Sequence, residues 1–132
     1  MNRIYRSIVA ALLLAPLSAL AGEVEILAAS FSAQADKTWN VSVTLQHADS
    51  GWEHYADAWR VVDPQGEVLG TRTLFHPHVD EQPFTRSLGS LKIPAAVTTV
   101  YIEAHDKVHG WSRQRLKIDL LKARAGRLQV HR

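Results

Sequence analysis

The stretch from Thr38 to Ala48 reads Thr-Trp-Asn-Val-Ser-Val-Thr-Leu-Gln-His-Ala. Its apolar residues Trp39, Val41, Val43 and Leu45 stand at every second position, with polar residues between them. Successive side chains of an extended chain point to opposite faces, so this period of two predicts a strand with one face in a core and the other in solvent.

Similar patterns recur in six other segments, which are separated by turn-forming residues. The expected strands are Val24 to Ala35, Thr38 to Ala48, Tyr55 to Val62, Val68 to Phe75, Phe84 to Ile93, Thr98 to Asp106 and Gln114 to Leu121. Gly89 predicts a bulge in the fifth of them. Seven short strands in about 100 residues, with no helical pattern, are typical of an immunoglobulin-like β-sandwich. An open barrel is the alternative fold.

The first 21 residues have the features of a secretory signal peptide. A basic start precedes the apolar run from Ile8 to Ala21, and Ala19-Leu20-Ala21 places the cleavage before Gly22. This run is shorter than the roughly 20 residues that a spanning helix needs, which disfavours the alternative of an uncleaved anchor. We therefore expect an exported bacterial protein, periplasmic or secreted, with a single domain formed by residues 22–132.

The composition narrows the range of partners and ligands. The chain has 15 Lys and Arg against 13 Asp and Glu, and Arg3 and Arg6 of the expected signal peptide account for the excess. A near-neutral domain is not expected to bind nucleic acid. No later segment is apolar enough to cross a membrane. The chain has no cysteine, so disulfides, thiolate ligands and a cysteine-linked lipid anchor are not expected.

Five of the seven histidines fall in three short segments, Gly51 to Tyr55, His76-Pro77-His78 and His105 to His109. In an immunoglobulin-like sandwich the third and sixth strands pair antiparallel, and the fourth returns beside the third, so these segments would meet at one end of the fold. If Trp59 points inward, Asp57 shares its face. The first and third segments would then place His54 and His105 side by side on the outer face.

Clustered imidazoles are good ligands for Zn(II) and Cu(II), and Pro77 stiffens the segment that carries two of them. Nearby carboxylates could complete or orient the ligand set; these are Glu53, Asp80, Glu81 and Asp106. The expected metal ligands are His54, His76, His78 and His105, followed by His109. His47 and His131 are expected to take no part. The ordinary alternative is that loop histidines are solvated polar groups.

Three segments carry a resemblance to other proteins: Glu53-His54-Tyr55-Ala56-Asp57, the run HPHVDEQPFTR from His76 to Arg86, and Ala104-His105-Asp106. Through them the chain resembles small secreted bacterial proteins of uncharacterised activity, which implies export and a shared site. Periplasmic copper-resistance proteins of the CopC type share the expected architecture, but Gly22 rather than a histidine would begin the processed chain. Copper-zinc superoxide dismutase differs in its cysteines and ligand spacing.

The sequence thus predicts a periplasmic metal-binding protein that holds Cu(II) or Zn(II) as a carrier, buffer or accessory. Hard Mg(II) and Ca(II) do not suit a histidine site, and Cu(I) is disfavoured without sulfur ligands. A non-catalytic interaction module of the cell envelope, with a protein partner, is the alternative. An enzyme is the least expected class, because the sequence contains no nucleophile motif such as Gly-X-Ser-X-Gly and no evident general base.

Overall fold

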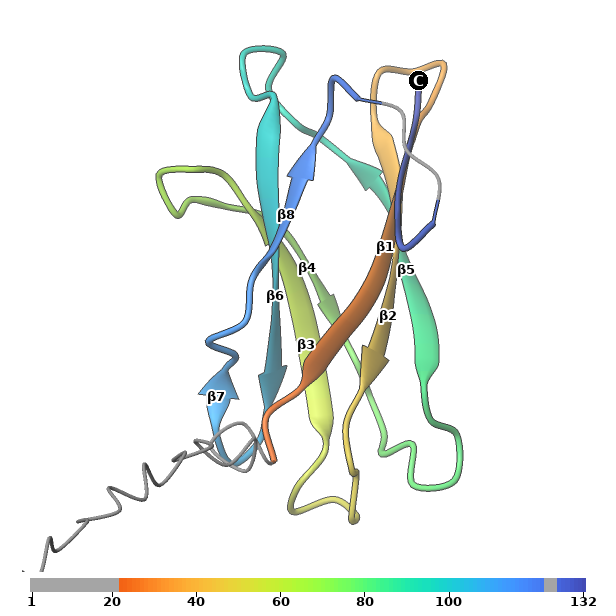
Figure 1. Ribbon diagram of the computed structural model, residues 1–132, viewed down its shortest axis with the longest axis vertical. Helices are drawn as coiled ribbons and strands as arrows, with labels where there is room; N and C mark the ends of the chain where they lie inside the picture. The colour runs from red at the N-terminus through yellow and green to blue at the C-terminus, as the bar shows by residue number, and fades with distance from the viewer. Residues whose placement is uncertain (1–21, 123–125) are drawn as a thin grey trace, which may run out of the picture.

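The structure is a computed structural model that describes residues 22–122 and 126–132, and these form two β-sheets and no helix (Figure 1). The expected signal peptide lies outside the described residues. The strands are β1 (Glu25–Ala33), β2 (Trp39–Gln46), β3 (Ala56–Val62), β4 (Val68–Thr73), β5 (Phe84–Leu91), β6 (Thr99–Asp106), β7 (Gly110–Trp111), β8 (Leu116–Asp119) and β9 (Leu128–His131).

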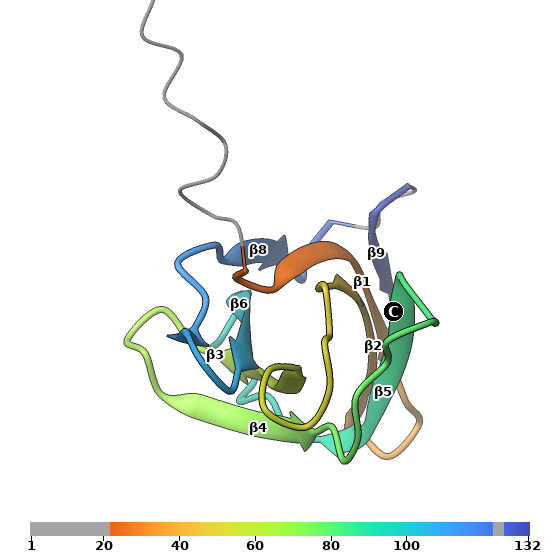
Figure 2. The same ribbon diagram turned by 90° about the horizontal axis from the view of Figure 1, so that it is seen from below.

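One sheet has the strand order β5-β2-β1-β9, and the other has the order β4-β3-β6-β7 with β8 also paired to β6. Figure 2 shows the two sheets facing each other around a shared interior. Each of the seven expected segments contains a strand, while β7 and β9 were not expected. The prediction of an all-β fold is confirmed, and its immunoglobulin-like type stays a prediction. No helix in the described part of the chain has the length and apolarity to span a bilayer.

The core is formed by the inner faces of both sheets, as the alternation in the sequence predicts. The inward residues of β2 are Trp39, Val41, Val43 and Leu45, and all are buried. On the opposite sheet, β6 buries every second residue, beginning at Val100, and β3 adds Trp59, which has no exposed surface. Each large apolar side chain so buried stabilises the fold by roughly 1.5–3 kcal/mol.

The fifth strand carries the bulge that Gly89 predicts. Trp39 of β2 pairs with Leu91 of β5, whereas Val41 pairs with Leu88, so β5 has one more residue than β2 over this interval. Ser90, in the bulge, has a φ of 54°. The register of β5 therefore shifts by one residue beyond this point.

A second irregularity, between Ala56 and Ala58 of β3, changes which side chains of this strand face the core. Ala56 and Trp59 are fully buried, while Asp57 is half-buried and bonds to His105. The expectation that Asp57 shares the inner face with Trp59 was therefore wrong. The bulge shifts the alternation by one residue, and the sequence pattern did not reveal it.

Gln114, which precedes β8, connects its sheet to β1 of the other sheet. Its side-chain amide donates to the Ile26 carbonyl at 3.1 Å and accepts from the Ile26 N–H at 2.8 Å. Ile26 is fully buried. We expect Gln114→Leu to lower the free energy of unfolding by about 1–3 kcal/mol, because the buried N–H loses its acceptor. Urea unfolding measures this change.

Gln65 provides the control for this prediction, because it lies exposed in the turn between β3 and β4. Gln65→Leu should change the free energy of unfolding by no more than about 0.5 kcal/mol. Equal effects of the two substitutions would show that Gln114 does not hold the sheets together.

Candidate metal centre

The three histidine-bearing segments do lie at one end of the fold. The first two lie in the β2–β3 and β4–β5 connections, and the third comprises the end of β6 and its connection to β7. All three are at the bottom of Figure 1 together with the start of β1. The expectation that they share one end follows from the antiparallel pairing of β3 with both β4 and β6, which the structure contains.

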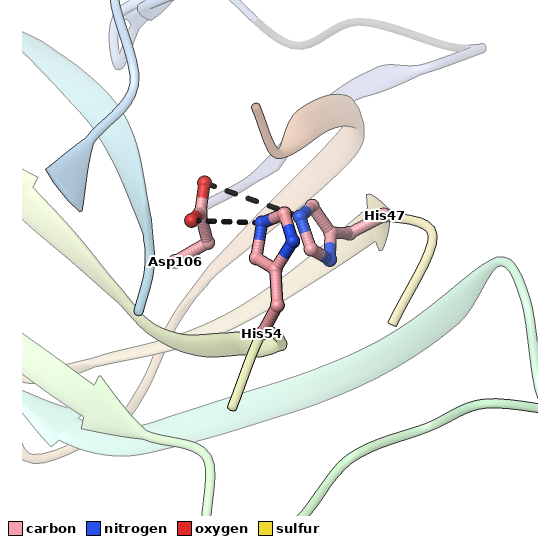
Figure 3. Close-up of side chains that lie close together, drawn as sticks. All are labelled: His47, His54 and Asp106. Carbon is pink, nitrogen blue, oxygen red and sulfur yellow. Dashed lines mark ion pairs between the residues drawn. The ribbon is translucent and has the colours of Figure 1, made fainter. Parts of the chain in front are cut away.

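At this end, His47, His54 and Asp106 each offer one ligand atom, and the three atoms lie within 4.8 Å of one another (Figure 3). The Nε2 atom of His54 is 3.2 Å from Oδ1 of Asp106, and Nε2 of His47 is 3.9 Å from Oδ2 of the same carboxylate. Two ligand atoms that each bind zinc at 2.0–2.2 Å lie at most about 4.4 Å apart. Both separations therefore allow a single ion between the pair.

Two members of this group occupy positions where an apolar core residue would be expected. On β2 every second residue up to Leu45 points inward, and His47, just past the end of the strand, continues this series. On β6 the inward series passes through Ala104 and ends at Asp106. His47 and Asp106 are both buried. The lining of the interior thus changes from apolar to polar at this end, and the two side chains face each other across the sheets.

His47 is held in place by bonds at both of its ring nitrogens. Its Nδ1 lies 2.5 Å from Oδ1 of Asp49, and its Nε2 donates to the Gly22 carbonyl at 2.8 Å. Asp49 also accepts the N–H groups of Ala56, at 3.0 Å, and of His78, at 2.7 Å. A carboxylate behind an imidazole fixes the ring of many metal-bound histidines, with the far nitrogen directed at the ion.

Asp106 is a carboxylate that local hydrogen bonds keep ionised. Burial by itself raises the pKa of Asp106, but hydrogen bonds from the backbone N–H groups of His109 and Val108, at 2.7 and 2.9 Å, outweigh it and hold this pKa below its usual range. The His109 ring also bonds to Asp106 at 3.0 Å. An anionic oxygen in a buried site attracts a cation, and three imidazole rings lie beside it.

His54 supplies the observation that points most directly to a ligand. Its Nε2 is buried and makes no hydrogen bond within the described part of the chain, although the Asp106 carboxylate is near. A buried polar atom without a partner costs free energy. A metal ion between His54 and Asp106 would give this nitrogen a partner, so the donor set fits Zn(II) or Cu(II).

His76 and His78 lie beside this group and have different partners. Their rings are 4.5 Å apart, and the His78 ring stacks on Phe84 at 4.1 Å. Nε2 of His78 lies 2.8 Å from Nη2 of Arg86, so it accepts a hydrogen bond from the guanidinium. This contact places a positive charge at Nε2 and disfavours a metal ion there, whereas Nδ1 of His78 is buried without a hydrogen bond in the described part of the chain.

The environment of His78 predicts a pH dependence of stability. Burial lowers the pKa of His78, and the positive charges of Arg86 and His76 lower it further. As the pH falls through the ordinary histidine value toward the lower folded value, the unfolded chain takes up a proton that the folded chain refuses. The free energy of unfolding therefore decreases over that window. We expect His78→Gln to weaken this decrease in urea unfolding of the metal-free protein at stepped pH.

The exposed His131, bonded to Gln129 on β9, provides the control for this pH dependence. His131→Gln should leave the decrease unchanged. An identical pH dependence in the wild type and in the His78 variant would show that folding does not lower the pKa of His78.

The remaining expected ligand, His105, lies on the outer face of β6. Its Nδ1 is 2.5 Å from Oδ1 of Asp57, and its ring is 4.9 Å from Trp111, on which the Arg60 guanidinium stacks. The expected pairing of His105 with His54 is absent from the contacts of the described residues, because the bulge in β3 turns Asp57 toward His105.

Of the five histidines predicted as ligands, the structure thus places His54 and His109 at Asp106, with ring centroids 5.0 Å apart, and His76 and His78 together beside them. His47, which was expected to take no part, belongs to the group because it continues the inward face of β2. The sequence signal for His47 was present in the alternation itself, which extends past Leu45.

Comparison with known proteins finds similarity over part of the chain. A relative from Halomicrobium mukohataei, named "Putative lipoprotein", is 42% identical over 78 residues. The match covers 59% of this chain and 38% of the relative, so the chain spans about two-fifths of the relative's length. No family model and no solved structure matches the chain.

Proposed function

We propose that this protein binds one Zn(II) or Cu(II) ion through His47, His54 and Asp106, with His109 beside Asp106 as a further candidate. The observation that carries the proposal is Nε2 of His54, which is buried without a hydrogen bond in the described part of the chain and lies 3.2 Å from the Asp106 carboxylate, beside a second imidazole. Imidazole and carboxylate ligands suit these two metals, and the chain has no cysteine to favour Cu(I).

An envelope or extracellular location accords with this function. The relative's name refers to a lipoprotein, and the first 21 residues of this chain have the pattern of an export signal. The domain is proposed to be an immunoglobulin-like sandwich. In support, β2 pairs with both β1 and β5, while β3 pairs with both β4 and β6.

The protein is proposed to be a carrier or buffer rather than an enzyme. The His54 side chain is 24% exposed, whereas His47 and Asp106 are buried, so the site lies at the edge of the protein interior. A site of this kind can exchange its ion with a partner or with the surrounding solution.

Calorimetric titration of untagged, metal-free protein comprising residues 22–132 tests the proposal. We expect one equivalent of Zn(II) or Cu(II) to bind with micromolar or tighter affinity. His54→Ala should weaken binding at least tenfold, which corresponds to about 1.4 kcal/mol, because one ligand is lost. His131→Ala serves as the matched control, since that ring lies on β9, and should bind as the wild type does.

The titration also separates the two possible ligand sets. Binding that survives His54→Ala but disappears in the double variant His76→Ala, His78→Ala would favour the histidines that the sequence first indicated. A folded protein that binds neither metal would overturn the proposal.

One observation favours a second candidate function, a protein-interaction module. Four large apolar side chains are more than half exposed in the loops at the histidine-bearing end: Trp52, Phe75, Val79 and Val108. Exposed apolar groups that gather in this way mark contact surfaces. A partner that docks at this end could receive the ion. If the protein binds no metal, docking of a protein partner on this surface would be the function of this end of the molecule.

A further inference from the structure

Gly22 lies against the candidate metal centre. Its carbonyl accepts the hydrogen bond from Nε2 of His47 at 2.8 Å. A side chain added at Gly22 would place its Cβ 2.6 Å from Cε1 and 3.1 Å from Nε2 of His109, so the Gly22 backbone packs on that ring. Its φ of 92° also lies in the region that favours glycine. Gly22 thus sits between two of the three imidazoles at this site.

Gly22 is also the residue that would begin the processed chain, because Ala19-Leu20-Ala21 has the small residues that signal peptidases require. The Gly22 nitrogen lies within about 4 Å of its own carbonyl oxygen by covalent geometry alone. Since that oxygen touches His47, the nitrogen is within reach of the same centre.

We propose that cleavage between Ala21 and Gly22 completes the metal centre, with the freed α-amino nitrogen of Gly22 as an additional ligand beside His47, His54 and Asp106. This inference rests on the proposed metal-binding function and adds a ligand and a regulation to it. The site would reach its full affinity only after export, in the compartment where the protein acts.

The chemistry of the nitrogen explains why cleavage matters. In the uncleaved chain the Gly22 nitrogen belongs to a peptide bond, and its lone pair is delocalised into the carbonyl group. Hydrolysis adds the hydroxyl of water to the Ala21 carbonyl and a hydrogen to the Gly22 nitrogen, which yields a carboxylate and an amine. The nitrogen of a free α-amine has a localised lone pair, which a metal ion can bind in place of a proton.

The carbonyl of the same residue strengthens the arrangement. An ion bonded to both the amine nitrogen and the carbonyl oxygen of Gly22 closes a five-membered ring through Cα and the carbonyl carbon. When the ion displaces the Nε2 proton of His47, the Gly22 oxygen loses its hydrogen-bond donor, and the ion takes that place. The hydrogen bond from His47 to Gly22 therefore marks where the added ligands would converge.

The test compares three proteins that differ only at the N-terminus. The first begins with a free Gly22, the second begins with an N-acetylated Gly22, and the third begins with an N-acetylated Ala21, so that in the last two the Gly22 nitrogen is an amide and no free α-amine is present. Each is titrated with Zn(II) by calorimetry, and its Cu(II) form is studied by electron paramagnetic resonance. Metal-free thermal unfolding of all three confirms that the fold is unchanged.

We expect both blocked proteins to bind Zn(II) at least tenfold more weakly than the free form, and their Cu(II) spectra to show one nitrogen ligand fewer. Equal affinities and identical spectra in all three proteins would overturn this inference and leave the metal-binding function standing. If no form binds either metal, the proposed function itself fails. A weaker affinity with an unchanged spectrum would mean that the N-terminal group only obstructs the site, and this too would overturn the inference.

Discussion

Replacing either His47 or Asp49 by alanine is expected to lower the free energy of unfolding of the metal-free protein by about 3–5 kcal/mol. Both side chains are fully buried and bond to each other at 2.5 Å. Removal of Asp49 leaves the buried N–H groups of Ala56 and His78 without their acceptor, as well as one nitrogen of His47. Removal of His47 takes one hydrogen-bond donor from the buried Asp49 carboxylate and leaves the Gly22 carbonyl without its donor.

A double-mutant cycle distinguishes this pairing from two independent losses. If the two side chains act as a unit, the double variant should cost about 1–3 kcal/mol less than the sum of the single variants, because each single change already breaks the shared bond. Urea unfolding in the presence of a chelator measures all four proteins without interference from metal.

The surface pair Asp119 and Lys122, which lie 3.8 Å apart and are half-buried and exposed respectively, provides the comparison cycle. An ion pair in solvent contributes little, so its coupling should not exceed about 1 kcal/mol. Strict additivity at His47 and Asp49, or a coupling no larger than that of the surface pair, would contradict the view that these two residues form one buried unit.

The fold was largely predictable from the sequence, because it depends on a backbone period that the apolar residues report directly. Trp39 to Leu45 alternates without interruption, and β2 is the strand that pairs with both β1 and β5. The short strands β7 and β9 were missed, since two and four residues are too few to show a period. Their formation depends on pairing with β6 and β1 rather than on their own pattern.

The sequence predicted at which end of the molecule the candidate site lies, but it did not predict which side chains form the site. Antiparallel pairing brought the right loops together, but the bulge in β3 decided which side chains turn inward, and no local sequence signal locates that bulge. The expectation placed His54 and His105 on one outer face. In the structure His54 lies with His47 and Asp106, whereas His105 lies on the outer face of β6.

The omission of His47 has a more specific cause. The inward face of β2 was followed only as far as Leu45, its last apolar residue, although the direction of a side chain is set by the backbone and not by its polarity. The same alternation, carried two residues further on β2 and on β6, reaches His47 and Asp106. Polar residues that continue a buried apolar face are therefore the sequence feature that would have located this site.

Saturation with metal should stabilise the folded protein, and Asp106→Asn should remove most of that gain. Free Zn(II) at one hundred times its dissociation constant raises the free energy of unfolding by about 2.7 kcal/mol if the ion binds only the folded state. Asparagine retains an oxygen that can accept the N–H groups of Val108 and His109, so the turn after β6 should persist. The variant loses the negative charge that attracts the ion.

Asp63 offers a closely matched control for this substitution. It is buried, lies at the other end of β3, and accepts two backbone N–H groups, from Gln65 and Glu67, each at 2.9 Å. Asp63→Asn should therefore keep the full gain on adding Zn(II), whatever its effect on the metal-free stability. Thermal and urea unfolding with and without the metal compare the two variants. A gain in Asp106→Asn as large as that of the wild type would mean that this carboxylate is no ligand, and that any bound ion is held elsewhere.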